Sequence, residues 1–491
     1  MQNWLTARAE RTPDAVGLIQ AAQAYHWFDL HILVNAWRRS TPAEFYPQMR
    51  VGVLMTSSLD AVVVLHALSR EGCIAVWLNT RLTPFELRAQ ITQARCTMLI
   101  YSRAFQAIVD QIDMPNCTPI AYDAQRETPR ASLAPDVEID LETPAAILFT
   151  SGTSGTSKGV VLTWGNFFTS AMASAYHLGT LPTDRWLCTL PLYHVGGLSI
   201  FYRACLYGIT VDLYERFETD IINQALTDDP ISLISLVPTQ LYRLLETRSA
   251  PWNSALRVIL LGGAAAADDL LARCKAENLP IATTYGLTES ASQVVTGFPG
   301  EYEGVGKPLM FTTIRVVDEQ GHDRPHGEIG EVTVQGPTVM QGYDDNPEAT
   351  AKALRDGVLY TGDMGYFDAK NSLHIVQRRS DLIVSGGENV YPAEVEAVLR
   401  QHPAVKEMCV VGVPNPEWGQ QVAAVLVMQP GQPLDEVSLI QFCRTRLAGY
   451  KMPRRWLAVD DLPQTASGKI ARRAVQDLFN HEGTKKSEEK L

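Results

Sequence analysis

The chain has 491 residues and a formal net charge of −12. A chain of this length is longer than a domain with a single hydrophobic core usually is, so we expect at least two domains. The acidic balance argues against broad binding to nucleic acid or anionic membranes, and 46% hydrophobic with 20% charged residues excludes a disordered or fibrous chain. No apolar run is long enough to insert into a membrane, the N-terminus lacks an apolar signal core, and the cysteines form no CxxC pair, so we expect a cytoplasmic protein.

The first half of the sequence alternates short apolar runs with amphipathic stretches. Strands are predicted at 51–55, 74–77, 97–101, 145–150, 231–236 and 257–261, and helices at 58–69 and 84–93. This alternation predicts βαβ units, and therefore mainly parallel sheets with helices on their faces. We expect an α/β fold whose large N-terminal domain contains two stacked, mainly parallel α/β subdomains.

After about Gly304 the sequence changes to short β-like runs punctuated by Gly, Asp and Pro. Runs at 314–318, 330–334 and 373–376 predict a small antiparallel or barrel-like subdomain. The remainder predicts a compact α+β unit, with helices at 392–401 and 437–447 and strands at 408–413 and 422–428. We therefore expect a large domain at 1–378, a small mobile C-terminal domain at 379–480 and a flexible tail at 481–491.

The densest chemical signal is the segment TSGTSGTSKG at 150–159, directly after a predicted strand. Glycines let backbone amides approach phosphate oxygens, hydroxyls add donors, and Lys158 adds a positive charge. It is not a Walker loop, because Ser157 stands where that loop has glycine before its lysine. A flexible linker is the alternative, and the preceding strand disfavours it. The predicted phosphate contacts are Thr150, Ser151, Gly152, Thr153, Ser154, Gly155 and Lys158.

The phosphate loop resembles the signature of the acyl-adenylate-forming, AMP-binding superfamily, which includes acyl-CoA ligases, peptide-synthetase adenylation domains and luciferases. Further motifs of that superfamily follow in the expected order: YGLTE at 285–289, YTGD at 360–363, RRSDLI at 378–383, SGGEN at 385–389 and PQTASGK at 463–469. The resemblance implies ATP, Mg²⁺, a small carboxylic acid and coenzyme A as reactants and partners. The sequence departs from the family pattern at Ser157 and Gln377, where proline and glycine are common.

The resemblance implies a catalytic role for four residues, Lys469, Thr288, Glu289 and His194. Lys469 would place its ammonium group at the α-phosphate and the acyl carboxylate, where charge repulsion between two anions must be overcome. Glu289 would bind Mg²⁺, which prefers hard oxygen ligands. Thr288 would contact the α-phosphate. The alternative for this last pair is an N-cap that begins a following helix.

The same resemblance implies residues that hold the nucleoside and the thiol. Tyr285 would lie against adenine, and Asp363 and Arg378 would contact the ribose. Gly386 and Gly387 would line the passage of the CoA pantetheine arm, and a simple turn is their alternative. Asp363 could likewise be an ordinary turn residue. The remaining predicted nucleotide contacts are Gly262, Gly263 and Gly286.

The motifs PLYH at 191–194, LLGG at 260–263 and SGGENVYP at 385–392 resemble the subfamily of ligases that activate o-succinylbenzoate in menaquinone biosynthesis. That acid carries a second carboxylate, and Arg203 matches an arginine that contacts it in the subfamily. An arginine that snorkels to the surface is the alternative. Ala264 stands where the subfamily often has glycine, which weakens the match at the acyl pocket. The predicted acyl-pocket residues are His194, which would gate the pocket, Arg203, Gly263, Ala264 and Ser292.

Taken together, the motifs predict ATP-dependent ligation of o-succinylbenzoate to coenzyme A through an acyl-adenylate, with release of AMP and pyrophosphate. A ligase for another aryl or medium-chain acid is the nearest alternative. A catalytically inactive nucleotide-binding or interaction module is the alternative from a different class. The sequence leaves open whether the chain forms a homo-oligomer.

Overall fold

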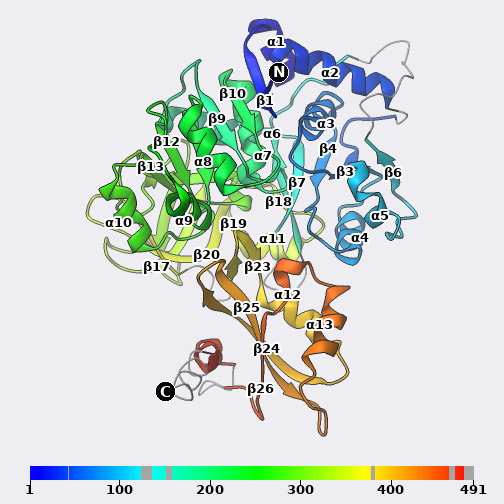
Figure 1. Ribbon diagram of the computed structural model, residues 1–491, viewed down its shortest axis with the longest axis vertical. Helices are drawn as coiled ribbons and strands as arrows, with labels where there is room; N and C mark the ends of the chain where they lie inside the picture. Colours follow the sequence, from blue (N-terminus) through cyan, green and yellow to red (C-terminus); the bar gives the residue numbers. More distant parts are fainter. Residues whose placement is uncertain (42–43, 123–134, 151–156, 378–381, 464–469, 480–491) are drawn as a thin grey trace. The chain divides into compact units, whose positions relative to one another are not determined.

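The computed structural model describes residues 1–41, 44–122, 135–150, 157–377, 382–463 and 470–479, and Figure 1 traces the chain from blue to red. These residues fall into two compact units. The first contains residues 1–80, 90–149 and 159–377, and the second contains 81–89, 150–158 and 378–491. The predicted domain boundary at 378/379 and the predicted tail at 481–491 lie outside the described residues.

A nine-stranded sheet is the larger of the two mixed sheets in the first unit, with the order β15–β14–β13–β12–β11–β9–β10–β1–β2. Its six central strands are parallel: β1 (Val16–Gln20), β9 (Arg185–Cys188), β10 (Thr210–Leu213), β11 (Leu233–Leu236), β12 (Val258–Leu261) and β13 (Ile281–Leu287). The edges, β2 (Gln23–His26), β14 (Ser292–Thr296) and β15 (Lys307–Pro308), are antiparallel. Strands β11 and β12 are buried throughout, which explains their continuous apolar sequences.

The second mixed sheet of the first unit has seven strands, in the order β18–β8–β7–β4–β3–β5–β6. The strands are β3 (Arg50–Leu54), β4 (Ile74–Trp77), β5 (Met98–Tyr101), β6 (Thr118–Ala121), β7 (Pro144–Thr150), β8 (Lys158–Thr163) and β18 (Gly342–Tyr343). Strands β3 to β7 pair in parallel, whereas β18 is antiparallel to β8. The predicted mainly parallel α/β architecture is confirmed.

Helices cover these sheets, and three of them matter most for the site. Helix α3 (Leu59–Arg70) is buried from Ala61 to its last residue, and the Ser58 hydroxyl caps its N-terminus. Helices α6 (Trp164–Leu178) and α7 (Val195–Tyr207) pack against each other and against β14. The others are α1 (Trp4–Arg11), α2 (Trp27–Ser40), α4 (Pro84–Gln93), α5 (Gln106–Val109), α8 (Thr219–Asp228), α9 (Pro238–Thr247), α10 (Asp268–Ala276) and α11 (Pro347–Ala353).

A small antiparallel sheet follows Gly304, as predicted. It contains β16 (Thr313–Val317), β17 (Gly330–Gln335), β19 (Leu354–Arg355), β20 (Val358–Phe367) and β21 (Leu373–Gln377). The second unit has its own mixed sheet of β22 (Ile383–Ser385), β23 (Glu388–Val390), β24 (Val405–Asn415), β25 (Gly419–Met428) and β26 (Arg455–Ala458), with α12 (Pro392–Leu399) and α13 (Glu436–Arg444). This composition confirms the predicted α+β C-terminal unit.

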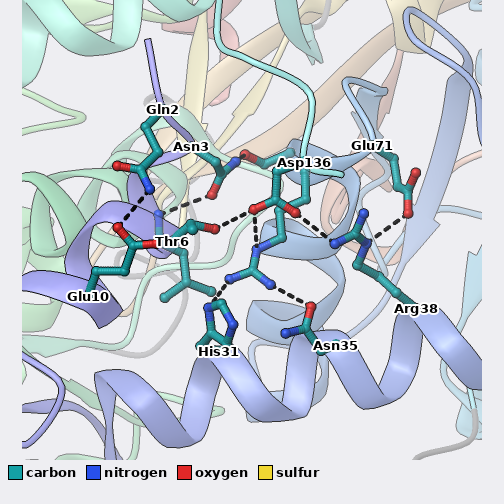
Figure 2. A network of polar contacts seen from close by, with 12 residues as sticks. Gln2, Asn3, Thr6, Glu10, His31, Asn35, Arg38, Glu71 and Asp136 are labelled. Atoms are coloured by element: carbon teal, nitrogen blue, oxygen red, sulfur yellow. Dashed lines mark hydrogen bonds and ion pairs between the residues drawn. The ribbon is translucent and has the colours of Figure 1, made fainter. Parts of the chain in front are cut away.

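A buried polar network joins the first three helices to the segment that contains Asp136 (Figure 2). The Asp136 carboxylate accepts hydrogen bonds from Arg38 Nη1 at 2.8 Å and Thr6 Oγ1 at 2.5 Å, and lies 3.6 Å from Arg70 Nε. Arg38 also donates to Glu71 at 2.8 Å. Arg70 is completely buried and donates to Asn35 and His31. One carboxylate, that of Asp136, therefore contacts residues of α1, α2 and α3.

The eight cysteines, all within the described residues, are buried and free. Burial raises the pKa of the Cys188 thiol to about 12, which keeps this group protonated and unreactive. Among the helices in the described part of the chain, none has the length and apolar character needed to cross a bilayer.

Candidate nucleotide and acyl site

Parallel strands bring several predicted site residues to one edge of the nine-stranded sheet. The loop that leads to His194 follows β9, Gly262 and Gly263 follow β12, and Tyr285 and Gly286 lie near the end of β13. Because parallel strands share their direction, these carboxyl ends lie at the same edge. The chain proceeds from β9 to β10 on one side and to β11 on the other, which makes β9 a topological switch point, where open α/β sheets bind ligands.

Two glycines at this edge are required because other groups approach their backbone closely. A Cβ atom at Gly262 would lie 2.6 Å from Thr284 Cγ2, and one at Gly286 would lie 1.5 Å from the Ser292 carbonyl oxygen. Gly263 has a φ of +80°, which L-residues with side chains rarely adopt. The glycines therefore have a steric explanation in the fold, and a role in nucleotide binding remains a proposal.

The turn after Gly286 differs from the sequence prediction. Residues Thr288–Ser290 form one 3-10 turn, and β14 begins at Ser292, so the predicted helix after Glu289 is wrong. Ala291 (φ 53°) and Ser292 (φ 92°) both have left-handed backbone conformations, which cost about 1–3 kcal/mol each for non-glycine residues. The antiparallel return of β14 along β13 requires this reversal. Such strain is typical of functional turns held by their surroundings.

Tyr285 and Asp363 are brought together from β13 and β20. Both side chains are buried, and the Tyr285 hydroxyl donates to Asp363 Oδ2 at 2.8 Å. The hydrogen bond orients the carboxylate on which the predicted ribose contact depends. The predicted turn role of Asp363 is wrong, because the residue lies inside strand β20.

Glu289 is the candidate metal ligand, and it is only 9% exposed. Its Oε1 atom accepts a hydrogen bond from the Tyr343 hydroxyl at 2.8 Å, while Oε2 has no hydrogen-bond partner among the described residues. No group of three or more metal-binding side chains occurs in the described parts of the chain. A single carboxylate fits Mg²⁺, because this ion commonly takes one or two carboxylates and completes its shell with water and substrate phosphates.

Arg203 lies on the inner face of α7 and is 2% exposed, so the predicted alternative of a snorkelling arginine is wrong. Its Nη2 donates to Ser170 Oγ at 3.2 Å, and its Nε has no hydrogen-bond partner in the described part of the chain. Ser170 Oγ in turn donates to the Ala291 carbonyl at 2.7 Å. Burial lowers the pKa of the Arg203 guanidinium. The guanidinium also lies 5.8 Å from the centroid of the Trp186 ring. No carboxylate in the described ranges pairs with this buried cation, which leaves it suited to an anionic ligand.

His194 and Ala264, the other predicted acyl-pocket positions, lie before α7 and after β12. His194 immediately precedes α7, and its ring packs edge-on against Tyr193 with centroids 4.7 Å apart. The first turn of α7 approaches the preceding loop so closely that a Cβ atom at Gly197 would lie 2.3 Å from the Pro191 carbonyl oxygen. Ala264 is half-buried after β12. The contacts of Tyr193 and Gly197 give His194 a defined position at the N-terminus of α7.

Gly386 and Gly387 occupy a hairpin turn in the second unit. They connect β22 and β23, in which Ser385 pairs with Glu388, and both have positive φ angles of 59° and 85°. A two-residue hairpin with left-handed residues at both positions favours glycine for backbone reasons alone. The turn interpretation is therefore confirmed, and their role in a CoA passage stays a prediction.

Several predicted site residues cannot be placed. Thr150 ends β7, which confirms the predicted strand before the phosphate loop, and Lys158 begins β8, a strand that was not predicted. The positions outside the described residues are Ser151, Gly152, Thr153, Ser154, Gly155, Arg378 and Lys469.

Two side chains in the site were not singled out from the sequence. Ser170 lies on α6 and Tyr343 lies on β18, each more than 30 residues from its partner Arg203 or Glu289. Neither belongs to a recognisable motif, so only the three-dimensional contacts reveal them.

Comparison with known proteins identifies the family. Residues 5–344 match the family model of the AMP-binding enzyme, and residues 394–469 match its C-terminal domain. The 2-succinylbenzoate–CoA ligase of Bacillus cytotoxicus is 38% identical over 487 residues, which cover 98% of this chain and 99% of the relative.

Two solved structures of o-succinylbenzoate CoA synthetase from Bacillus subtilis are also similar. The first, a double mutant bound to a product analogue, has a TM-score of 0.90 and 35% identity, with 97% of this chain and 98% of that chain covered. The second, in complex with ATP and magnesium ion, has a TM-score of 0.72 and 34% identity, with 96% and 99% covered. The chain belongs to the AMP-binding enzyme family, within the acyl-adenylate-forming superfamily.

Proposed function

From this family membership, we propose that the chain ligates o-succinylbenzoate to coenzyme A. ATP and the acid would first form an acyl-adenylate with release of pyrophosphate. The CoA thiol would then attack the acyl carbonyl and release AMP. Curated relatives with this activity match over nearly the full length of the chain, which supports both the reaction and the acid.

Buried, unpaired Arg203 is the observation that carries the choice of acid. A monocarboxylic acid uses its only carboxylate in the reaction and leaves this cation without a negatively charged partner. A second carboxylate on the substrate would compensate the buried charge, directly or through a bridging water. Ser170 holds the guanidinium toward the turn at Ala291, which lies two residues after Glu289. The same turn would therefore connect recognition of the acid with the phosphate site.

Adenylation requires a carboxylate to approach the α-phosphorus of ATP although both are anions. Catalysis then depends mainly on orientation and on positive charge placed at the transition state. We assign Lys469 and Thr288 to the α-phosphate and acyl carboxylate, and the loop ending in Lys158 to the outer phosphates. Glu289 would hold Mg²⁺, which supplies charge neutralisation at the phosphates. Asp363, oriented by Tyr285, would accept hydrogen bonds from the ribose.

A panel of acids separates this proposal from its alternatives. AMP release would be measured with MgATP and o-succinylbenzoate, benzoate or octanoate, each with and without CoA. We expect fast, CoA-dependent AMP formation with o-succinylbenzoate. A faster reaction with benzoate or octanoate would show that the chain is a ligase for an acid other than o-succinylbenzoate. No acid-dependent AMP at all would favour an inactive nucleotide-binding module.

Replacing Arg203 with methionine is expected to reduce kcat/KM for o-succinylbenzoate by about 10²-fold, because the second carboxylate loses a buried charge partner. Turnover of benzoate, which has no second carboxylate, should change little. Arg216→Met, at an exposed arginine, is the control and should affect neither acid. Equal losses for both acids would show that Arg203 only supports the fold.

A further inference from the structure

Glu289 is held on two sides by one segment of the chain, residues 340–344. The Met340 backbone N–H donates to the Glu289 carbonyl at 2.9 Å, and the Tyr343 hydroxyl donates to Glu289 Oε1 at 2.8 Å. Both side chains are buried. The segment therefore fixes the backbone position of Glu289 and also the orientation of its carboxylate.

The same segment is anchored to β8, the strand that leaves the phosphate loop. Gly342 and Tyr343 pair with Val161 and Val160, and the Asp344 N–H donates to the Gly159 carbonyl at 2.7 Å. We call residues 340–344 the bridge segment, because it connects β8 with the Glu289 turn.

Charged and polar contacts make the bridge segment rigid. Arg50 binds the Asp344 carboxylate with two hydrogen bonds of 2.9 and 2.8 Å, a planar two-point contact that restricts rotation. The Asn166 side chain donates to the carbonyls of Pro337 and Val339 at 2.8 and 2.9 Å, immediately before the segment. A movement of β8 would consequently shift Glu289, and a movement of Glu289 would shift β8.

We propose that Tyr343 is a positioning residue for the Glu289 carboxylate, which it orients toward Mg²⁺ bound with ATP. This inference rests on the proposed function, because it assumes that Glu289 holds the metal. The phenol engages Oε1, and Oε2 would remain available to hold the ion. A carboxylate already fixed by a neutral donor loses less rotational freedom when it binds a metal. Tyr343 would not touch the reacting atoms.

Equilibrium binding of ATP, with Mg²⁺ and with EDTA in its place, tests the proposal without requiring turnover. Substituting Tyr343→Phe removes only the hydroxyl and should reduce the Mg²⁺-dependent gain in ATP affinity by about 10-fold, while affinity in EDTA stays unchanged. Glu289→Gln should reduce the same gain at least as much. The double variant should be no worse than Glu289→Gln, since the hydroxyl acts through that carboxylate.

Tyr242→Phe, at an exposed tyrosine, is the matched control and should keep the full Mg²⁺ effect. If Tyr343→Phe does not fold, Tyr343→Met also lacks the hydroxyl and carries the same expectation. An equal loss of affinity with and without Mg²⁺, or an unchanged Mg²⁺ effect, would overturn the positioning role. Failure of the unmodified protein to bind ATP would instead contradict the proposed function, and the positioning role with it.

Discussion

Replacing Lys469 with alanine is expected to slow acyl-adenylate formation by about 10³-fold, the largest effect that we predict for a single side chain. The lysine belongs to the PQTASGK motif at 463–469, and its position lies outside the described residues. The expectation rests on chemistry: an anionic carboxylate must attack an anionic phosphate, and one precisely placed cation can stabilise the charge that both share. Acid-dependent pyrophosphate release in single-turnover experiments measures this step directly.

Two comparisons make the Lys469 result specific. Conversion of a chemically supplied acyl-adenylate to the CoA thioester should be little affected, because that step needs no further charge at the pyrophosphate-leaving centre. Lys370→Ala, at an exposed lysine paired only with surface Glu303, should leave both steps unchanged. Pyrophosphate release by Lys469→Ala at the normal rate would show that this lysine does not take part in catalysis.

Substitution of Asp136 by alanine is expected to reduce the free energy of unfolding by about 3 kcal/mol. The change leaves Arg38 and Arg70 buried without the carboxylate that lies 2.8 Å from Arg38 and 3.6 Å from Arg70, and an uncompensated buried charge is costly. Burial and the charge of Arg70 lower the pKa of His31, so the neighbouring imidazole is favoured in its neutral form and cannot replace the lost negative charge. Urea denaturation followed by tryptophan fluorescence measures the loss.

A surface ion pair provides the control for the Asp136 prediction. Glu303 and Lys370 lie 2.7 Å apart with both side chains mostly exposed, and Glu303→Ala should hardly change the denaturation midpoint. Because the contacts of Asp136 in the described part of the chain are with Thr6, Arg38 and Arg70, none of them a candidate site residue, the variant should retain its kcat at temperatures where it remains folded. Similar small effects of both substitutions would show that the buried network contributes little to stability.

Much of the fold could be predicted from the sequence because its strands are short, apolar and well separated. The predicted runs at 74–77 and 84–93 coincide with β4 and α4. The region after Glu289 could not be predicted in this way, since its conformation depends on the long-range pairing of β14 with β13 and on two left-handed non-glycine residues. The local sequence pattern favours a helix after Glu289, but the pairing of β14 with β13 determines the observed conformation.

The candidate site was predictable only where it lies in motifs. Tyr285, Glu289 and Asp363 belong to contiguous signatures, and the structure brings Tyr285 and Asp363 into hydrogen-bond contact. The supporting residues Ser170 and Tyr343 are single positions in ordinary helix and strand sequences, whose importance arises from distant partners. Burial of Arg203 was equally hidden, because an arginine in an apolar helix is compatible with either a buried or a snorkelling side chain.

Detection of the acyl-adenylate tests the central claim most directly. The enzyme would be mixed with o-succinylbenzoate and MgATP in the absence of CoA, quenched, and analysed by mass spectrometry before and after CoA is added. We predict one equivalent of o-succinylbenzoyl-adenylate per active site together with pyrophosphate, and its conversion to o-succinylbenzoyl-CoA and AMP after addition of the thiol. Absence of any adenylate, or an adenylate that CoA leaves unchanged, would contradict the proposed ligase reaction.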